Sequence, residues 1–254
     1  YHKNFLEMPV FYYFFFIIQV KTKAIVLHSV KYGDAQLIVD ILTAEVGRVS
    51  FVCRMPRTAK GKLKKQFFQP LHLLDLVFDY RPNASLQHIK DVRLLVPLVS
   101  IPADPYKLSI SLFLAEFLCH ATRGERQSNL LFDYVEHSVL WLDGASRSYA
   151  NFHLVFMMRL SRFLGFFPNL DDFAPGRCFD LREGVFTDRL PCHADYVAAD
   201  EAGRIIPLMR MDYQTMHLFR MSREERNRCT GWILHYYRLH VPQFPELRSL
   251  SVLQ

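Results

Sequence analysis

The segment Arg54–Lys65, RMPRTAKGKLKK, separates two runs of alternating apolar residues, and this arrangement determines the predicted fold of the first part of the chain. The segment carries six Lys and Arg residues and no Asp or Glu. Because a Pro and a Gly lie inside it, we predict a loop with a short helical turn near Leu63–Phe68. A basic loop between two strands can follow a polyanionic backbone, although a lysine-rich run by itself is more often a solvated surface.

Five strand-like runs flank this loop. Before it, Val49, Phe51 and Cys53 are expected to point one way and Arg48, Ser50 and Arg54 the other, and after it the run 72–80 also alternates. The remaining runs are 24–30, 37–42 and 85–95. Five short strands with one long insertion between the third and the fourth predict a small closed barrel. The OB-fold is the commonest barrel of this kind that binds oligonucleotides.

Helical patterns begin after residue 100. Asp104 is a predicted N-cap ahead of Pro105. Ser222 and Glu225 form the capping box of a last helix that ends near His240. Helices are also predicted for 128–144, 148–163 and 202–211, and the segment 166–199 is expected to be irregular. The predicted fold class is therefore α+β and multidomain, with an N-terminal OB-fold β-barrel and an all-α C-terminal domain.

We place the barrel in residues 21–98 and the helical domain in 99–254. Residues 1–20 form an apolar N-terminal extension with an aromatic-rich run, MPVFYYFFFIIQV, at 8–20. This run is short for a membrane span and lacks the basic and small residues of a signal peptide. It is either an extra strand or a stretch translated from upstream of the true start. We favour the second interpretation, in which the run is not native, and assign it no function.

The positive charge is concentrated in the first part of the chain. Residues 21–100 contain 13 Lys and Arg against 6 Asp and Glu, whereas residues 101–254 contain 17 against 18. The N-terminal domain is therefore expected to bind an anionic partner, and the C-terminal domain is expected to have a different function. The 5 cysteines are odd in number and contain no C-x-x-C pair, which indicates reduced thiols and a cytoplasmic protein.

Motifs of common enzyme classes are absent from the sequence. It contains no phosphate loop, no G-x-G-x-x-G, no H-E-x-x-H and no G-x-S-x-G. His235 and His240 are five residues apart, a spacing that does not place two metal ligands on one helix face. We expect no catalytic residue, no metal, no cofactor and no membrane contact, and therefore no enzyme.

Several motifs together resemble the bacterial RecO family, in the form found in Bacteroides. They are Lys23–Leu27, Tyr32-Gly33-Asp34, Ile38–Thr43 with Glu45 and Gly47-Arg48, Gln69-Pro70-Leu71, Arg159-Leu160, Leu164-Gly165-Phe166 with Pro168-Asn169-Leu170, and His240-Val241-Pro242 with Phe244–Leu250. The resemblance covers residues 21–254, and its specificity comes from the order and spacing of the motifs.

The resemblance implies a mediator of DNA repair and recombination. Such a protein binds single- and double-stranded DNA and anneals complementary strands. The implied partners are RecR and the C-terminal tail of single-stranded DNA-binding protein, and the implied outcome is loading of RecA in gap and break repair. Some members bind zinc through four cysteines after the central helix. Here that segment offers only Cys178 and Cys192, with His193 as a third candidate, so no zinc site is expected.

The candidate interface follows from the basic loop. We expect its six cations to contact phosphates without reading sequence, namely Arg54, Arg57, Lys60, Lys62, Lys64 and Lys65. Phe67, Phe68 and Tyr80 are candidates for stacking on bases wherever they are exposed, with core packing as the competing interpretation. Alternatives are a sequence-independent RNA-binding OB protein, a scaffold that binds an acidic protein, and a hydrolase with an unrecognised site.

Overall fold

The N-terminal part forms one curled antiparallel sheet. The computed structural model describes residues 18–54 and 64–253. The strands are β1 (Ile18–Tyr32), β2 (Gln36–Thr43), β3 (Gly47–Arg54), β4 (Leu73–Tyr80) and β5 (Ile89–Val96), and the short helix η1 (Lys65–Phe68) precedes β4. Their order is β3-β2-β1-β4-β5. The long strand β1 pairs with β4 along its first part and with β2 along its second, so the sheet bends around its own core.

The sheet approaches a barrel without closing into one. Its edge strands meet at a single parallel bridge, in which Val52 and Gln87 donate backbone N–H groups to Gln87 and Ser50 at 3.0 and 2.9 Å. Gln87 is only 3% exposed, and its side-chain amide donates to the carbonyls of Arg81 and Ala84, both at 2.9 Å. The predicted α+β class with an OB-like sheet is confirmed. The predicted complete closure is wrong, because one bridge stands where a ladder of hydrogen bonds would be needed.

Strand β1 extends further toward the N-terminus than its predicted run. It begins at Ile18, which pairs with Tyr80 of β4, so Ile18–Val20 belong to the sheet and not to an extension. The rest of the aromatic-rich run at 8–20 lies outside the described residues.

The C-terminal part is mostly helical. Its helices are α1 (Pro105–Ala121), α2 (Asn129–Gly144), α3 (Phe152–Phe163), α4 (Ala199–Ala202), α5 (Ile205–Arg210), η2 (Met216–Leu218), α6 (Arg223–His240) and α7 (Leu250–Leu253). The predicted caps are present. The Asp104 carboxylate accepts from the N–H of Tyr106 at 2.9 Å, and Ser222 and Glu225 complete the capping box of α6.

A second, small sheet makes the all-α prediction for this domain wrong. Strands β6 (Cys178–Asp180), β7 (Val185–Thr187) and β8 (Tyr196–Val197) pair in the order β7-β6-β8. Phe179, Phe186 and Val197 are buried on it, and Phe179 faces Tyr236 of α6. The segment was expected to be irregular because its strands have only two or three residues, too few for a detectable alternation.

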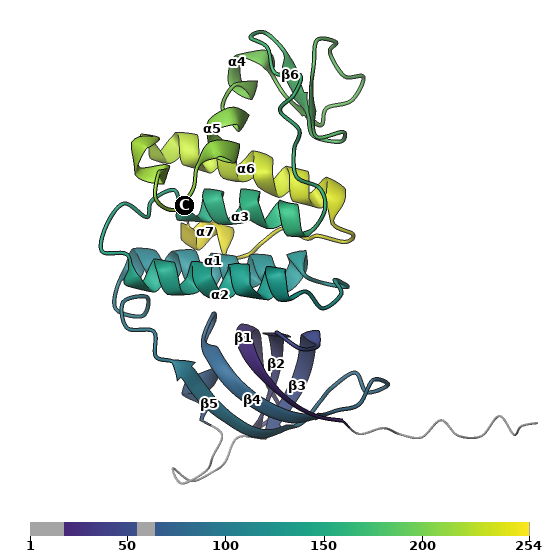
Figure 1. Cartoon of the computed structure of the whole chain (residues 1–254), viewed down its shortest axis with the longest axis vertical. Helices are drawn as coiled ribbons and strands as arrows, with labels where there is room; N and C mark the ends of the chain where they lie inside the picture. Colours follow the sequence, from purple (N-terminus) through teal and green to yellow (C-terminus); the bar gives the residue numbers. More distant parts are fainter. Residues whose placement is uncertain (1–17, 55–63, 254) are drawn as a thin grey trace, which may run out of the picture.

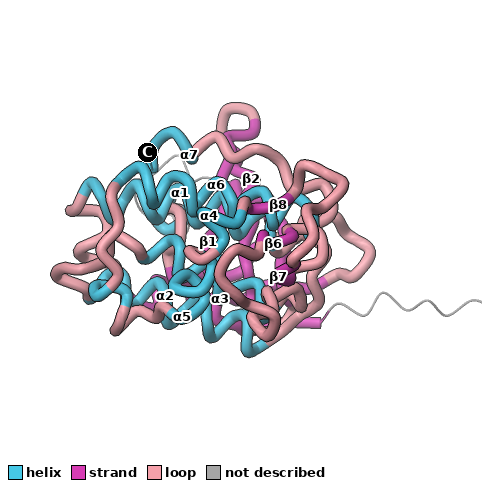
Figure 2. The backbone as a smooth tube through the Cα atoms, turned by 90° about the horizontal axis from the view of Figure 1, so that it is seen from above, coloured by secondary structure: helices cyan, strands magenta, loops and turns pink. Residues whose placement is uncertain are grey.

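The molecule is layered along its long axis (Figure 1). The first sheet lies at one end, α1 and α2 lie across it, α3 and α6 form the next layer, and the small sheet lies at the far end. Viewed along that axis, the small sheet lies to one side of the helices (Figure 2). One apolar core fills the sheet, and a second core joins the helices to Ile25, Leu27, Leu42, Leu71 and Leu73 of the sheet domain.

The connection from β5 to α1 is tied to the end of α2. The Asp143 carboxylate accepts from the backbone N–H groups of Val99, Ser100 and Ile101 at 2.8–3.0 Å. Lys107 is 2% exposed, and its ammonium group donates to the Ser100 hydroxyl at 2.6 Å and to the carbonyl of Asp143 at 3.2 Å. A buried cation is thereby placed at the carbonyl end of a helix, where the helix dipole stabilises it.

Candidate nucleic-acid interface

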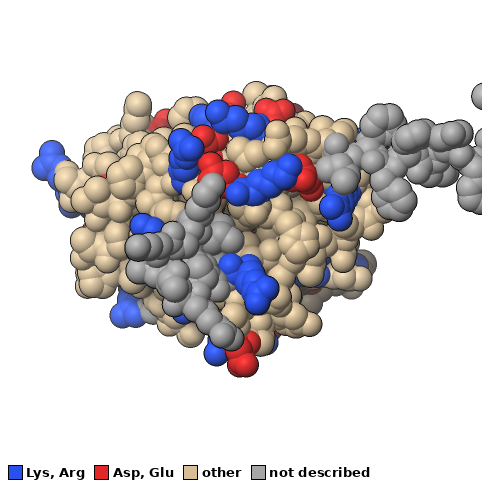
Figure 3. Space-filling view, turned by 90° about the horizontal axis from the view of Figure 1, so that it is seen from below, with Lys and Arg blue, Asp and Glu red and all other residues tan. Residues whose placement is uncertain are grey.

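The described cations of the basic loop lie on the surface of the sheet domain. Arg54 ends β3, Lys64 directly precedes η1 and Lys65 begins it, and all three are exposed. The predicted helical turn at Leu63–Phe68 is confirmed from Lys65 onward by η1. The other three predicted cations, Arg57, Lys60 and Lys62, lie outside the described residues. Figure 3 looks onto the sheet end of the molecule, where Lys and Arg side chains are spread over the surface with Asp and Glu among them.

The three aromatic candidates for base stacking differ in burial. Phe68 is 1% exposed inside the core of the sheet domain, so its ring cannot offer a face to a base. Phe67 and Tyr80 are half-buried against the same core, and Tyr80 meets the edge of Phe78 at 6.2 Å between ring centroids. Tyr32, which is 59% exposed at the end of β1, was not among the residues predicted from the sequence to stack on bases. Its place directly before a Gly-Asp turn is the sequence signal for a hairpin tip.

Three polar contacts fix the sheet domain against the helices. The Lys23 ammonium pairs with the Glu136 carboxylate of α2 at 3.0 Å. The Gln127 amide donates to the Ala44 carbonyl at 2.7 Å, and a Cβ on Gly47 would lie 3.3 Å from the Gln127 backbone. Gly47 has a φ of +76°, which glycine adopts without strain, so the β2–β3 turn can approach the helical domain closely.

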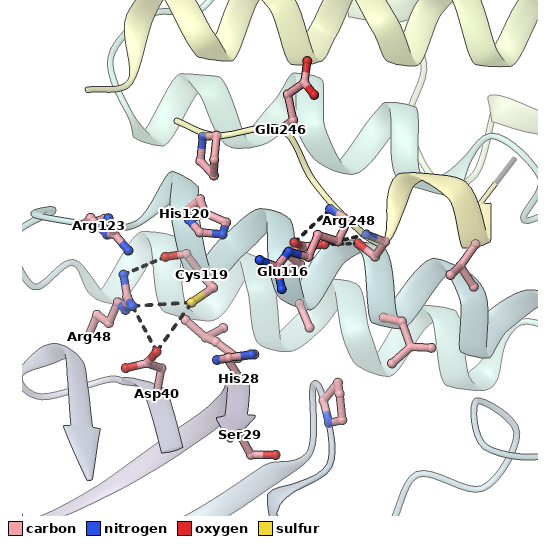
Figure 4. A pocket seen from close by; sticks show the side chains of 17 residues that line it. His28, Ser29, Asp40, Arg48, Glu116, Cys119, His120, Arg123, Glu246 and Arg248 are labelled. Atoms are coloured by element: carbon pink, nitrogen blue, oxygen red, sulfur yellow. Dashed lines mark hydrogen bonds and ion pairs between the residues drawn. The ribbon is translucent and has the colours of Figure 1, made fainter. Parts of the chain in front are cut away.

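The third contact centres on Arg48 and lies in a groove between the domains (Figure 4). Its guanidinium donates to the Cys119 carbonyl of α1 at 2.6 Å and pairs with Asp40 at 3.2 Å. The groove has a volume of about 760 Å³. Burial raises the pKa of the Cys119 thiol to about 11, so this cysteine is a structural residue and not a nucleophile.

The C-terminal segment forms another wall of the same groove. The Glu116 carboxylate of α1 accepts from the backbone N–H groups of Arg248 and Ser249 at 3.0 and 2.8 Å (Figure 4). Burial by itself raises the pKa of Glu116, but the hydrogen bonds from Ser249 and Arg248 outweigh it and lower the pKa overall. A negative charge on Glu116 therefore secures the start of α7.

A second groove, of about 800 Å³, lies on the helical domain between the starts of α1 and α6. Arg147, Arg223 and Arg226 line it together with apolar side chains that include Tyr106 and Val252. Tyr106 is 77% exposed and Val252 is 52% exposed. Guanidinium groups beside an open apolar surface suit a ligand that carries both a carboxylate and an apolar side chain.

Comparison with protein families identifies the chain. Residues 17–98 match the family model "Recombination protein O N terminal", and residues 102–250 match "Recombination protein O C terminal". The chain belongs to the RecO family. Its curated relatives are named DNA repair protein RecO. The resemblance to the RecO of Bacteroides is thus confirmed, and the chain is a member of a DNA-repair and recombination family.

The relatives match along nearly their whole length. The RecO of Bacteroides fragilis is 53% identical over 235 residues, which cover 92% of this chain and 97% of that protein. The RecO of Phocaeicola vulgatus is 50% identical over 234 residues, with the same coverage of both chains. The RecO of Porphyromonas gingivalis is 33% identical over 241 residues, again covering 92% and 97%.

The small sheet lies in the segment for which the family resemblance suggested zinc, and the side chains here do not fit that metal. Asp195 accepts from Arg182 and contacts His235, each at 2.7 Å, and His193 pairs with Asp180 at 3.3 Å. These carboxylates already hold cationic or imidazole partners. Within residues 18–54 and 64–253, no three His, Cys, Asp or Glu side chains are grouped to hold a metal ion. Likewise, none of the described helices is both long and apolar enough to span a membrane.

Proposed function

We propose that this chain is a non-enzymatic recombination mediator that binds single- and double-stranded DNA and anneals complementary single strands. Membership of a DNA-repair family supports DNA as the polyanion. The observation that carries the proposal is the exposure of Arg54, Lys64 and Lys65 at both ends of the basic loop, on an OB-like sheet. The three remaining candidates for phosphate contact, Arg57, Lys60 and Lys62, come from the sequence alone.

Annealing on such a surface needs no catalytic residue. Two DNA strands repel each other through their phosphates, and a shared basic surface lowers that repulsion by neutralising part of the charge. If all six cations engage a single strand, the log–log slope of affinity against salt is about −4. Affinity then falls by a few hundred-fold between 50 and 200 mM salt, on the same relation.

The helical domain is the proposed partner-binding half. Its three arginines at the second groove can bind the terminal carboxylate of a peptide, and the exposed Tyr106 and Val252 can pack against an apolar side chain beside it. We assign this groove to the C-terminal tail of single-stranded DNA-binding protein. RecR is a further proposed partner, and loading of RecA is the proposed result of the assembly.

The decisive experiment measures annealing of complementary oligonucleotides with and without single-stranded DNA-binding protein. The test variant changes Lys60, Lys62, Lys64 and Lys65 to Glu. A matched control reverses four exposed charges on the helical domain, Arg189, Arg210, Arg220 and Arg238. We expect the lysine variant to lose both annealing activity and its salt-dependent affinity for DNA. The arginine control should retain both.

Equal annealing by both variants would exclude the loop as the DNA-binding element. Stronger binding to RNA than to DNA of the same length would favour the RNA-binding alternative.

For the partner, Arg147→Ala combined with Arg223→Ala is expected to abolish binding of a peptide copy of the tail while annealing of naked strands persists. Retained peptide binding would remove the second groove from the proposal.

A further inference from the structure

Tyr32 lies at the tip of the hairpin that joins β1 to β2, beside the start of the basic loop. In the strand ladders, Tyr32 pairs with Gln36, and Gln36 pairs with Arg54. Residues paired directly across strands point to the same face of a sheet. Because neighbouring strands are about 4.8 Å apart, the backbones of Tyr32 and Arg54 are separated by about 10 Å on that face.

This face points away from the core of the sheet domain. The alternate residues of the same ladder, Leu37 and Cys53, are 5% and 1% exposed inside the core. On the outer face, Tyr32 is 59% exposed, and Val30, two residues earlier, is 46% exposed. An aromatic ring and an aliphatic side chain therefore lie open to solvent next to an exposed arginine. Lys31 is also exposed at this hairpin, but it pairs with Leu37 and therefore leaves the strand on the opposite face, so Arg54 is the cation that shares the outer face with Tyr32.

An exposed aromatic ring on the same face as an exposed arginine has the chemistry of a platform for nucleobases. A base offers a π-face to the ring, while its phosphate lies within reach of a guanidinium or ammonium group. Only unpaired bases expose their faces, because in a duplex each face is covered by its neighbours in the stack. The ligand that fits is thus a single strand and not a duplex.

We propose that Tyr32 stacks on a base of single-stranded nucleic acid bound along the outer face of β1 and β2, with Arg54 holding the adjacent backbone. The inference rests on the proposed function, which it refines from phosphate contact alone to phosphate contact plus base stacking. It moves the stacking site from Phe67, Phe68 and Tyr80 to the hairpin tip. It also predicts tighter binding to single strands than to duplexes, because only unpaired bases can stack on the ring.

The test is fluorescence anisotropy with three ligands of equal length: oligo-dT, the same backbone without bases, and duplex DNA. Stacking on one base is worth a factor of about 5 to 150 in affinity, so Tyr32→Ala should weaken binding to oligo-dT by that factor. Tyr32→Phe keeps the ring face and should bind as the wild type does. Neither variant should change the affinity for the baseless backbone or for the duplex. Unchanged affinity for these two ligands also shows that the variants are folded.

Salt dependence separates this inference from the function on which it rests. Stacking releases no counterions, so Tyr32→Ala should keep the log–log salt slope of the wild type while the Lys→Glu loop variant flattens it. Wild-type binding of oligo-dT with no response to Tyr32→Ala overturns the stacking site alone. An equal loss on the baseless backbone also overturns it. Absence of salt-dependent DNA binding by the wild type overturns the proposed function.

Discussion

The buried histidine of α3 provides a direct test of the helical core through pH. The imidazole Nε2 of His153 lies 3.2 Å from the hydroxyl of Thr230, and that hydroxyl donates its only proton to the Arg226 carbonyl at 2.8 Å. Nε2 must therefore be the donor, so the neutral ring carries its proton there. The other nitrogen, Nδ1, is buried without a hydrogen-bond partner among the described residues. A second proton on the ring would find neither solvent nor an acceptor.

Burial, assisted by the charge of Arg226, lowers the pKa of His153 from 6.5 to about 3. The unfolded chain binds a proton as the pH falls below 6.5, whereas the folded chain does not bind it until near pH 3. Stability is therefore fully present above pH 6.5 and is lost as the pH falls toward the folded pKa. Between pH 7 and pH 5 the loss from this one group is about 2 kcal/mol.

The perturbation is His153→Gln, whose amide can still donate to Thr230 but does not titrate. Urea unfolding of both proteins at pH 7 and pH 5 gives two stability differences. Because the other titrating groups are common to both proteins, their contributions cancel. The variant should gain about 2 kcal/mol relative to the wild type on going to pH 5. A stability difference that is the same at both pH values would refute the neutral, buried state of His153.

Three further substitutions test other parts of the fold by urea unfolding at pH 7. Gln87→Ala removes the buried amide that closes the β4–β5 hairpin and should cost about 3 kcal/mol; a change near zero would show that the hairpin closes without it. Lys107→Met removes the ammonium group that donates to the Ser100 hydroxyl and to the carbonyls of Asp143 and Ala145 at the end of α2, for an expected loss of about 2 kcal/mol. Gly47→Ala places a side chain at a φ of +76° against Gln127 and should cost about 1–2 kcal/mol, whereas Gly144→Ala, with open space around its Cβ position, should not destabilise through a steric contact.

The sequence was most informative where a local signal sets the structure. Asp104 before Pro105, and Ser222 three residues before Glu225, define helix starts through bonds that span only a few residues. The strands were recognisable because Val49, Phe51 and Cys53 alternate with more exposed residues.

What the sequence could not predict depends on contacts between distant residues. The single bridge between Phe51 and Gln87 joins strands that are far apart in the chain, and no local pattern encodes it. For the interface, the charge of the sequence was enough to identify the basic loop. Which aromatic side chains are exposed enough to stack on bases depends on their burial in the folded protein. Phe68 and Tyr32 are both adjacent to polar residues in the sequence, yet one is in the core and the other is open to solvent. Such a distinction depends on the register of β1 for Tyr32 and on how η1 packs against the sheet for Phe68.

The contacts of Lys23, Arg48 and Gln127 across the domain boundary have a consequence for binding two ligands at once. They hold the sheet surface and the helical groove at a constant separation. A DNA strand and a peptide tail that belongs to a protein already on that strand are themselves tethered to each other. Once one is captured, the other is presented at a high effective concentration, and the second association becomes intramolecular. Under the proposed function, coated DNA would thus be selected over naked DNA by avidity alone, without any change in the shape of the protein.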